Sequence, residues 1–210
     1  MAVRKVVTRR SRNVRGYMPS FKMGCAVAWE SQNELKLLRI LELSGAVRCY
    51  DVQPSVETIQ VGNELQIYFP DVQVTYKNGR TVTLEVKPKA RMATPKVAAR
   101  MKAFAEQCEL VGREFFVITD EELESEVRNN NAEELMYHRR PISREIKLQI
   151  FQRIQESGPT NVGELQAALG LQLTDIALGL GLVGVNLEEL IKRQSAIYIN
   201  GGHLHANLHP

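Results

Sequence analysis

Cysteine is scarce in this 210-residue sequence, and the three cysteines lie far apart. Cys25, Cys49 and Cys108 form no CxxC pair, so the sequence gives no sign of a zinc knuckle, a redox motif or a disulfide framework. Long apolar runs are also missing, since none approaches the roughly 20 residues that cross a bilayer. The first residues lack the apolar stretch of a secretion signal. We therefore expect a cytoplasmic protein with reduced thiols and no membrane segment.

Acidic residues are absent from two stretches, residues 1–29 and residues 86–105, both of which are rich in lysine and arginine. The net charge is only +3, so the basic residues are concentrated in these stretches rather than in large excess. Such clusters suit a polyanion, because cations that neutralise phosphates release condensed counterions. The alternative is a basic tail and a solvated helix face. The residues that we expect to contact double-stranded DNA are Arg10, Arg12, Arg15, Lys22, Lys89, Arg91, Lys96 and Arg100.

Capping signals mark two helices in the first two thirds of the chain. Ser31 and Glu34 have the spacing of a capping box, and leucines follow at helical spacing. Thr94 followed by Pro95 is typical of the start of a second helix, and Gly112 is placed to end it.

Strand-like runs lie between and after these helices, at residues 47–52, 59–61, 65–69, 72–76, 81–87 and 115–118. The order of helix, strands, helix and strand predicts an α/β or α+β domain with a mixed sheet flanked by helices. We expect this domain at residues 24–135, after an irregular basic arm at residues 1–23.

The last third of the sequence predicts a second, smaller domain at residues 142–210, joined by a connection over residues 128–143. Three short helices are expected at residues 144–156, 161–169 and 174–182. They are followed by a terminal hairpin of residues 197–199 with 203–208, which suggests a winged-helix-like module. His203 and His205 would be exposed on that hairpin. No lysine or arginine lies between Thr174 and Leu190, so reading of base edges by the third helix is poorly supported. Docking of another protein is at least as well supported.

The clearest local signal is a β-hairpin that begins after Pro70-Asp71 and ends in Glu85-Val86-Lys87. Two residues apart in a strand, Glu85 and Lys87 face the same side, and Val86 faces the core. A two-residue Asn78-Gly79 loop would pair Asp71 with Val86, on the wrong face. A three-residue loop with a left-handed Gly79 pairs Asp71 with Glu85 instead. We predict the three-residue loop.

Two carboxylates and an ammonium at one end of a hairpin suit hydrolysis of a phosphodiester. Asp71 and Glu85 can hold Mg²⁺, which prefers oxygen ligands, and Lys87 can orient a water or stabilise developing charge. The alternative is an exposed Glu–Lys pair with no site, because the pattern alone is short. Glu34 lies on the apolar face of its helix and is the candidate fourth member. Glu30, one turn earlier, is the alternative acid.

The same residues, taken with others, resemble the TnsA endonuclease subunit of heteromeric transposases. The similarity covers residues 14–120 in order and spacing. It is carried by Pro19-Ser20-Phe21-Lys22-Met23-Gly24, Trp29-Glu30-Ser31, Glu34, Leu41-Glu42, Val47, Tyr50, Gln53-Pro54, Pro70-Asp71 and Glu85-Val86-Lys87-Pro88.

This resemblance implies a PD-(D/E)xK, restriction-endonuclease-like fold and cleavage at transposon 5′ ends. It implies a catalytic set of Glu34, Asp71, Glu85 and Lys87, with Gln53 in a positioning role. Mg²⁺, or Mn²⁺ in its place, would be bound by Asp71, Glu85, the Val86 backbone carbonyl and Glu34. The implied partners are the DDE transposase TnsB, which cuts the 3′ ends, and the AAA+ regulator TnsC.

Two other functions fit the same sequence features. One is a stand-alone nuclease of the same fold, acting in repair or defence. The other is a DNA-binding adaptor without catalytic activity. The sequence does not specify the end sequence, the target-selection route or the oligomeric state.

Overall fold

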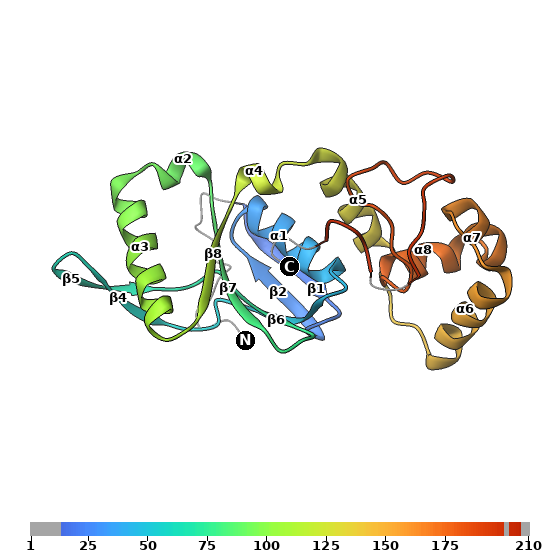
Figure 1. The fold of residues 1–210 in the computed structure, drawn as a ribbon, viewed down its shortest axis with the longest axis horizontal. Helices are drawn as coiled ribbons and strands as arrows, with labels where there is room; N and C mark the ends of the chain where they lie inside the picture. The colour runs from blue at the N-terminus through green and yellow to red at the C-terminus, as the bar shows by residue number, and fades with distance from the viewer. Residues whose placement is uncertain (1–13, 200–201, 207–210) are drawn as a thin grey trace. The chain divides into compact units, whose positions relative to one another are not determined.

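The computed structural model describes residues 14–199 and 202–206, and it divides into two compact units (Figure 1). The first unit contains the residues up to Leu38 together with Val47–Glu124. The second contains Arg39–Ala46 and the residues from Ser125 onward. Within the described part of the chain, no helix combines the length and the apolar character needed to cross a membrane.

A four-stranded mixed sheet forms the centre of the first unit. Its order is β3 (Val47–Val52), β6 (Val72–Tyr76), β7 (Thr81–Lys87) and β8 (Glu114–Thr119). The β7–β8 pair is parallel and the other pairs are antiparallel. A parallel pair needs a crossover, which the helix α3 (Pro95–Leu110) supplies. The predicted mixed sheet with flanking helices is confirmed, and α3 lies on one side of it with α1 (Gln32–Leu43) on the other (Figure 1).

The β6–β7 hairpin has the predicted register. Val72 pairs with Leu84 and Thr75 with Thr81, and the Tyr76 amide donates to the Arg80 carbonyl at 2.8 Å. This leaves a three-residue loop in which Gly79 has φ +89°, a conformation that favours glycine. The same register, continued by one residue, brings Asp71 opposite Glu85.

Two antiparallel pairs lie outside this sheet. They are β1 (Gly16–Ser20) with β2 (Cys25–Trp29), which precede β3 in the sequence, and β4 (Glu57–Val61) with β5 (Glu64–Tyr68), which lie between β3 and β6 in the sequence. The expectation of an irregular arm over residues 1–23 is wrong at Gly16–Ser20. Pairing with β2 overrides the local effect of Gly16 and Pro19, and Met18 is buried. Residues 1–13, including Arg10 and Arg12, lie outside the described residues.

The β4–β5 hairpin packs on α3 through a small apolar cluster of Ile59, Tyr68, Met101, Phe104 and Cys108. Two short helices lie near the ends of the parallel strands, α2 (Lys89–Met92) after β7 and α4 (Asp120–Leu123) after β8. The acidic first turn of α4, Asp120-Glu121-Glu122, suits the positive end of a helix.

The second unit contains a helix where the sequence predicted a connection. The expectation of a linker over residues 128–143 is wrong, because Glu126–Tyr137 forms α5. Ser125 caps it by accepting from the Arg128 amide, and Asn131 is buried with its amide nitrogen donating to the carbonyls of Leu187 and Glu189. Asn131, one of three consecutive asparagines that favour a loop locally, is therefore satisfied by contacts distant in sequence.

Three further helices complete this unit: α6 (Arg144–Ser157), α7 (Val162–Leu169) and α8 (Leu171–Gly179). The first two match the prediction, whereas α8 begins and ends three residues earlier than expected. The side chains of Ile150, Ile154, Leu165 and Leu187 are among those that fill the core. The predicted pairing of 197–199 with 203–208 is not found between the described residues. Instead, Tyr198 bridges to Gly184 and Leu204 to Asn186.

His203 is buried, contrary to the expectation that it would be exposed. Its Nδ1 accepts from the Val185 amide at 3.2 Å and its Nε2 lies 3.0 Å from the Leu178 carbonyl oxygen. Burial lowers the pKa of His203 to about 4, so the ring is neutral and joins two backbone segments. His205 remains exposed, as expected.

Replacing His203 with alanine should lower the free energy of unfolding by about 2–4 kcal/mol, because a cavity opens and two buried backbone groups lose their partner. Urea unfolding at pH 7 measures this change. His205→Asn is the matched control, since asparagine tolerates the left-handed backbone at that exposed position. Equal stability of the two variants would contradict the structural role of the His203 ring.

Candidate active site

A cavity of about 430 Å³ in the first unit is lined by four of the candidate catalytic residues, Glu34, Asp71, Glu85 and Lys87, whereas the fifth, Gln53, does not line it. It opens beside the first turn of α1, the segment after β5, the end of β7 and the helices α2 and α3. Its charged lining residues are Arg15, Glu30, Glu34, Asp71, Glu85, Lys87, Arg91 and Arg100.

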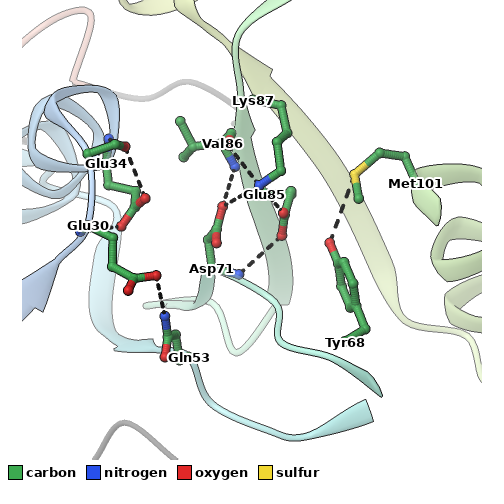
Figure 2. Close-up of polar contacts among 10 residues, drawn as sticks. Glu30, Glu34, Gln53, Tyr68, Asp71, Glu85, Val86, Lys87 and Met101 are labelled. Carbon is green, nitrogen blue, oxygen red and sulfur yellow. Dashed lines mark hydrogen bonds and ion pairs between the residues drawn. The ribbon is translucent and has the colours of Figure 1, made fainter. Parts of the chain in front are cut away.

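Asp71 and Glu85 interlock across the hairpin (Figure 2). The Asp71 Oδ2 accepts from the Val86 amide at 2.8 Å, and the Asp71 amide donates to the Glu85 Oε2 at 3.3 Å. Burial raises the pKa of Asp71, although the Lys87 ammonium opposes this shift. Each carboxyl group is therefore fixed to the backbone on the opposite side of the hairpin, in a place where its charge is costly.

Lys87 is the cation that both carboxylates share. Its Nζ forms an ion pair with Glu85, lies 3.5 Å from the Asp71 Oδ2 and donates to the Val86 carbonyl at 3.2 Å. Burial and then the charge of Asp71 raise the pKa of Glu85 to about 7. Burial works against the charged ammonium of Lys87, but the charges of Asp71 and Glu85 still raise its pKa.

Glu34 faces the same cavity from the first turn of α1 (Figure 2). Its carboxylate accepts from the Glu30 amide at 2.8 Å and from the Ser31 hydroxyl at 3.0 Å. The Glu34 amide in turn donates to the Ser31 Oγ at 3.2 Å. Burial and then the charge of Asp71 raise the pKa of Glu34 to about 7.

Glu30 also lines the cavity, but it is compensated by positive and polar groups. Arg15 lies 3.0 Å from its Oε1, and the Gln53 Nε2 donates to its Oε2 at 3.3 Å. Gln53 is buried with φ +47°, and its backbone amide donates to the Asp71 backbone carbonyl at 2.8 Å. Gln53 thus links Glu30 to the backbone of Asp71, which agrees with a positioning role without testing it.

Of the described cations that were expected to contact DNA, some line the cavity and others do not. Arg15, Arg91 and Arg100 line the cavity. Lys22 donates to the Val47 carbonyl at 2.6 Å, Lys89 pairs with Glu121 at 2.6 Å, and Lys96 is exposed at the start of α3. These last three do not belong to the cavity lining, so any contact with DNA would lie outside the cavity.

Residues 44–120 match the family model described as TnsA-like endonuclease N terminal. The chain carries a TnsA-like nuclease domain. The matched region runs from just before β3 through β8 and contains Gln53, Asp71, Glu85 and Lys87, whereas Glu34 lies before it. No curated protein matches the chain.

The TnsA-like domain has a donor set that fits a hard divalent cation. Across residues 14–199 and 202–206, no three histidine, cysteine, aspartate or glutamate side chains form a ready-made metal cage. Mg²⁺ does not require one, because it keeps several waters and is often held by one or two carboxylates. Asp71, Glu85 and the Val86 carbonyl supply such oxygens. Burial and then the charge of Asp71 raise the pKa values of Glu34 and Glu85, and a bound cation would relieve both effects.

Tyr68 is a residue of the TnsA-like site that the sequence analysis missed. It ends β5, is buried and lines the cavity three residues before Asp71. Its position in a strand-like run suggested only core packing. The contact that sets it apart, its hydroxyl beside Glu85, depends on how β5 meets β7 and could not be inferred from spacing.

The Glu34→Gln substitution should stabilise the metal-free TnsA-like domain as pH rises. The pKa of Glu34 is about 7 in the folded chain against an ordinary 4.5. The raised pKa therefore adds to the free energy of unfolding in full below pH 4.5, and this contribution is lost as pH rises through 7. At pH 8 the variant should be roughly 1–3 kcal/mol more stable than the wild type, and near pH 4.5 about equally stable. Urea unfolding in EDTA at both pH values measures this. If the free energy of unfolding of the wild type and of Glu34→Gln depends on pH in the same way, the raised pKa of Glu34 is contradicted.

Proposed function

We propose that this chain is the DNA-cleaving subunit of a heteromeric transposase, hydrolysing the phosphodiester at transposon 5′ ends with Mg²⁺, or Mn²⁺ in its place. The observation that carries the proposal is the convergence of Asp71, Glu85 and Lys87 in one cavity of a TnsA-like domain. Three arginines on the same cavity give it the charge that a DNA phosphate requires.

The roles of the residues follow from their positions. Bound Mg²⁺ would lower the pKa of a water and polarise the scissile phosphate, and Asp71, Glu85 and the Val86 carbonyl would hold it, with Glu34 nearby. Lys87 orients the attacking water or stabilises charge on the phosphoryl oxygens. Arg15, Arg91 and Arg100 bind the phosphates on either side, and Gln53 holds the backbone of Asp71.

The second unit would be a winged-helix-like module that docks a protein. Its helices α6, α7 and α8 precede a strand-like segment in which Gly184 bridges to Tyr198. Because α8 carries Asp175 and no lysine or arginine, contact with DNA bases through this helix is disfavoured. We propose the AAA+ regulator TnsC as its partner and the DDE transposase TnsB as the partner that cuts the 3′ ends.

End-labelled DNA carrying one transposon end tests this function. We expect the chain with its DDE transposase and Mg²⁺ to cut the 5′ strand at that end, and EDTA to prevent cutting. Cleavage of unrelated DNA by the chain alone, with no gain from the transposase, would favour a stand-alone nuclease. Intact DNA under all of these conditions, with retained DNA binding, would favour a non-catalytic adaptor.

A further inference from the structure

The ring of Tyr68 is held firmly between β5 and α3. Its centroid lies 4.4 Å from that of Phe104, and both side chains belong to the apolar cluster that also contains Met101. Only 3% of Tyr68 is exposed, so a rotation of the ring would disturb the packing of α3. The direction of the hydroxyl is therefore fixed by the core.

That hydroxyl lies beside the candidate metal ligand Glu85. Figure 2 shows it next to the Glu85 carboxylate, and both residues line the same cavity. The hydroxyl donates to the Met101 sulfur at 3.9 Å, which is a weak acceptor. Because a hydroxyl proton can rotate about the C–O bond, the Glu85 carboxylate can replace the sulfur as its acceptor.

Arg100, a cation that lines the cavity, lies over the face of the Tyr68 ring. The Arg100 guanidinium carbon lies 5.6 Å from the centroid of Tyr68, within the range of a cation–π contact. Arg100 also donates to the Ile67 carbonyl at 3.2 Å, so it is held at two points near the cavity. Tyr68 thus lies against a proposed metal ligand, Glu85, and a proposed phosphate-binding residue, Arg100.

We propose that Tyr68 is a positioning residue of the nuclease site, whose hydroxyl orients the Glu85 carboxylate for metal binding and whose ring face orients Arg100 for a DNA phosphate. This inference rests on the proposed function. Groups that orient metal ligands are commonly worth about 10–100-fold in metal affinity. The two contacts belong to different atoms of Tyr68, so they can be removed separately.

Tyr76 offers a matched comparison within the same unit. It is also a buried strand tyrosine with an arginine over its ring, since the Arg80 guanidinium carbon lies 5.7 Å from its centroid. It does not line the cavity. Loss of the Tyr76 hydroxyl therefore reports what removing such a group does to packing alone.

The test measures Mn²⁺ binding by calorimetry and binding of a short DNA duplex in EDTA, on the full chain. Tyr68→Phe should weaken Mn²⁺ binding about 10-fold and leave duplex binding unchanged. Tyr68→Leu should weaken Mn²⁺ binding equally and duplex binding by about threefold as well. Tyr76→Phe should change neither.

Mn²⁺ binding by Tyr68→Phe as tight as that of the wild type and of Tyr76→Phe would overturn the inference while leaving the proposed function intact. The Phe variant keeps the ring, so this outcome does not depend on whether Tyr68→Leu folds. Absence of Mn²⁺ binding by the wild type would instead overturn the proposed function, and the inference with it.

Discussion

Replacing Asp71 with alanine is expected to lower cleavage at the transposon end by about 10³-fold in a chain that still folds. Asp71 supplies one of the two hairpin carboxylates, and its Oδ2 is fixed by the Val86 amide at 2.8 Å. Without it, Glu85 and Lys87 are left as an ion pair with no second carboxylate to hold a divalent cation against the phosphate. The end-cleavage assay with transposase and Mg²⁺ gives the rate, and circular dichroism checks folding.

Asp51→Asn is the control for this substitution. Asp51 lies on β3, opposite Gln73, and does not line the cavity. Its loss should leave the rate within about twofold, since surface changes away from such sites are usually small. Wild-type cleavage by Asp71→Ala would show that the reaction occurs elsewhere in the chain.

The second large effect is expected for Lys87→Ala, which should lower the cleavage rate by about 10²–10³-fold without weakening metal binding. The ammonium neutralises Asp71 and Glu85, so its removal leaves both carboxylates with more negative charge to offer a cation. Mn²⁺ affinity should therefore be retained or increased. This separates Lys87, which acts on water or phosphate, from Asp71, whose loss removes the metal.

Lys77→Ala provides the matched control on the same hairpin. Lys77 is exposed in the loop at the far end of the hairpin from the carboxylates. It should match the wild type in both cleavage and Mn²⁺ binding. A Lys87 variant that loses Mn²⁺ binding in proportion to cleavage would mean that the lysine acts only by maintaining the site's structure.

The hairpin could be predicted because its determinants are local. Alternating strands and the Lys77-Asn78-Gly79 loop set the register, and the register alone places Asp71 opposite Glu85. Residues two apart on β7 then bring Lys87 to the same face. The central chemistry of the candidate site is therefore contained in fewer than twenty consecutive residues, where turn chemistry and strand alternation agree.

The predictions from the sequence were wrong where contacts between residues distant in the sequence decide the structure. Residues 129–131 are asparagines and favour a loop by local preference, yet α5 forms because Asn131 is bonded by the carbonyls of Leu187 and Glu189. Gly16–Ser20 is a strand because β2 pairs with it. His203 is buried because Val185 and Leu178 each offer a backbone partner. No pattern within a short window contains these partners.

The candidate site shows the same division. Glu34, Asp71, Glu85 and Lys87 could be selected by residue type and spacing. The links from Arg15 to Glu30 and from Gln53 to Glu30 join separate elements, and Tyr68 lies beside Glu85 from another strand, so these neighbours required the assembled fold. Both Glu30 and Glu34 reach the cavity. Burial and then the charge of Asp71 raise the pKa of Glu34 to about 7, which favours Glu34 as the acid that a cation would relieve.

The central claim is that Asp71 and Glu85 hold a divalent cation. Anomalous X-ray scattering from crystals soaked in Mn²⁺ tests it most directly. The predicted result is a peak within coordination distance of the carboxylates of Asp71 and Glu85, and no such peak in Asp71→Ala crystals treated in the same way. A wild-type peak elsewhere, or none at this position at saturating Mn²⁺, would contradict the account.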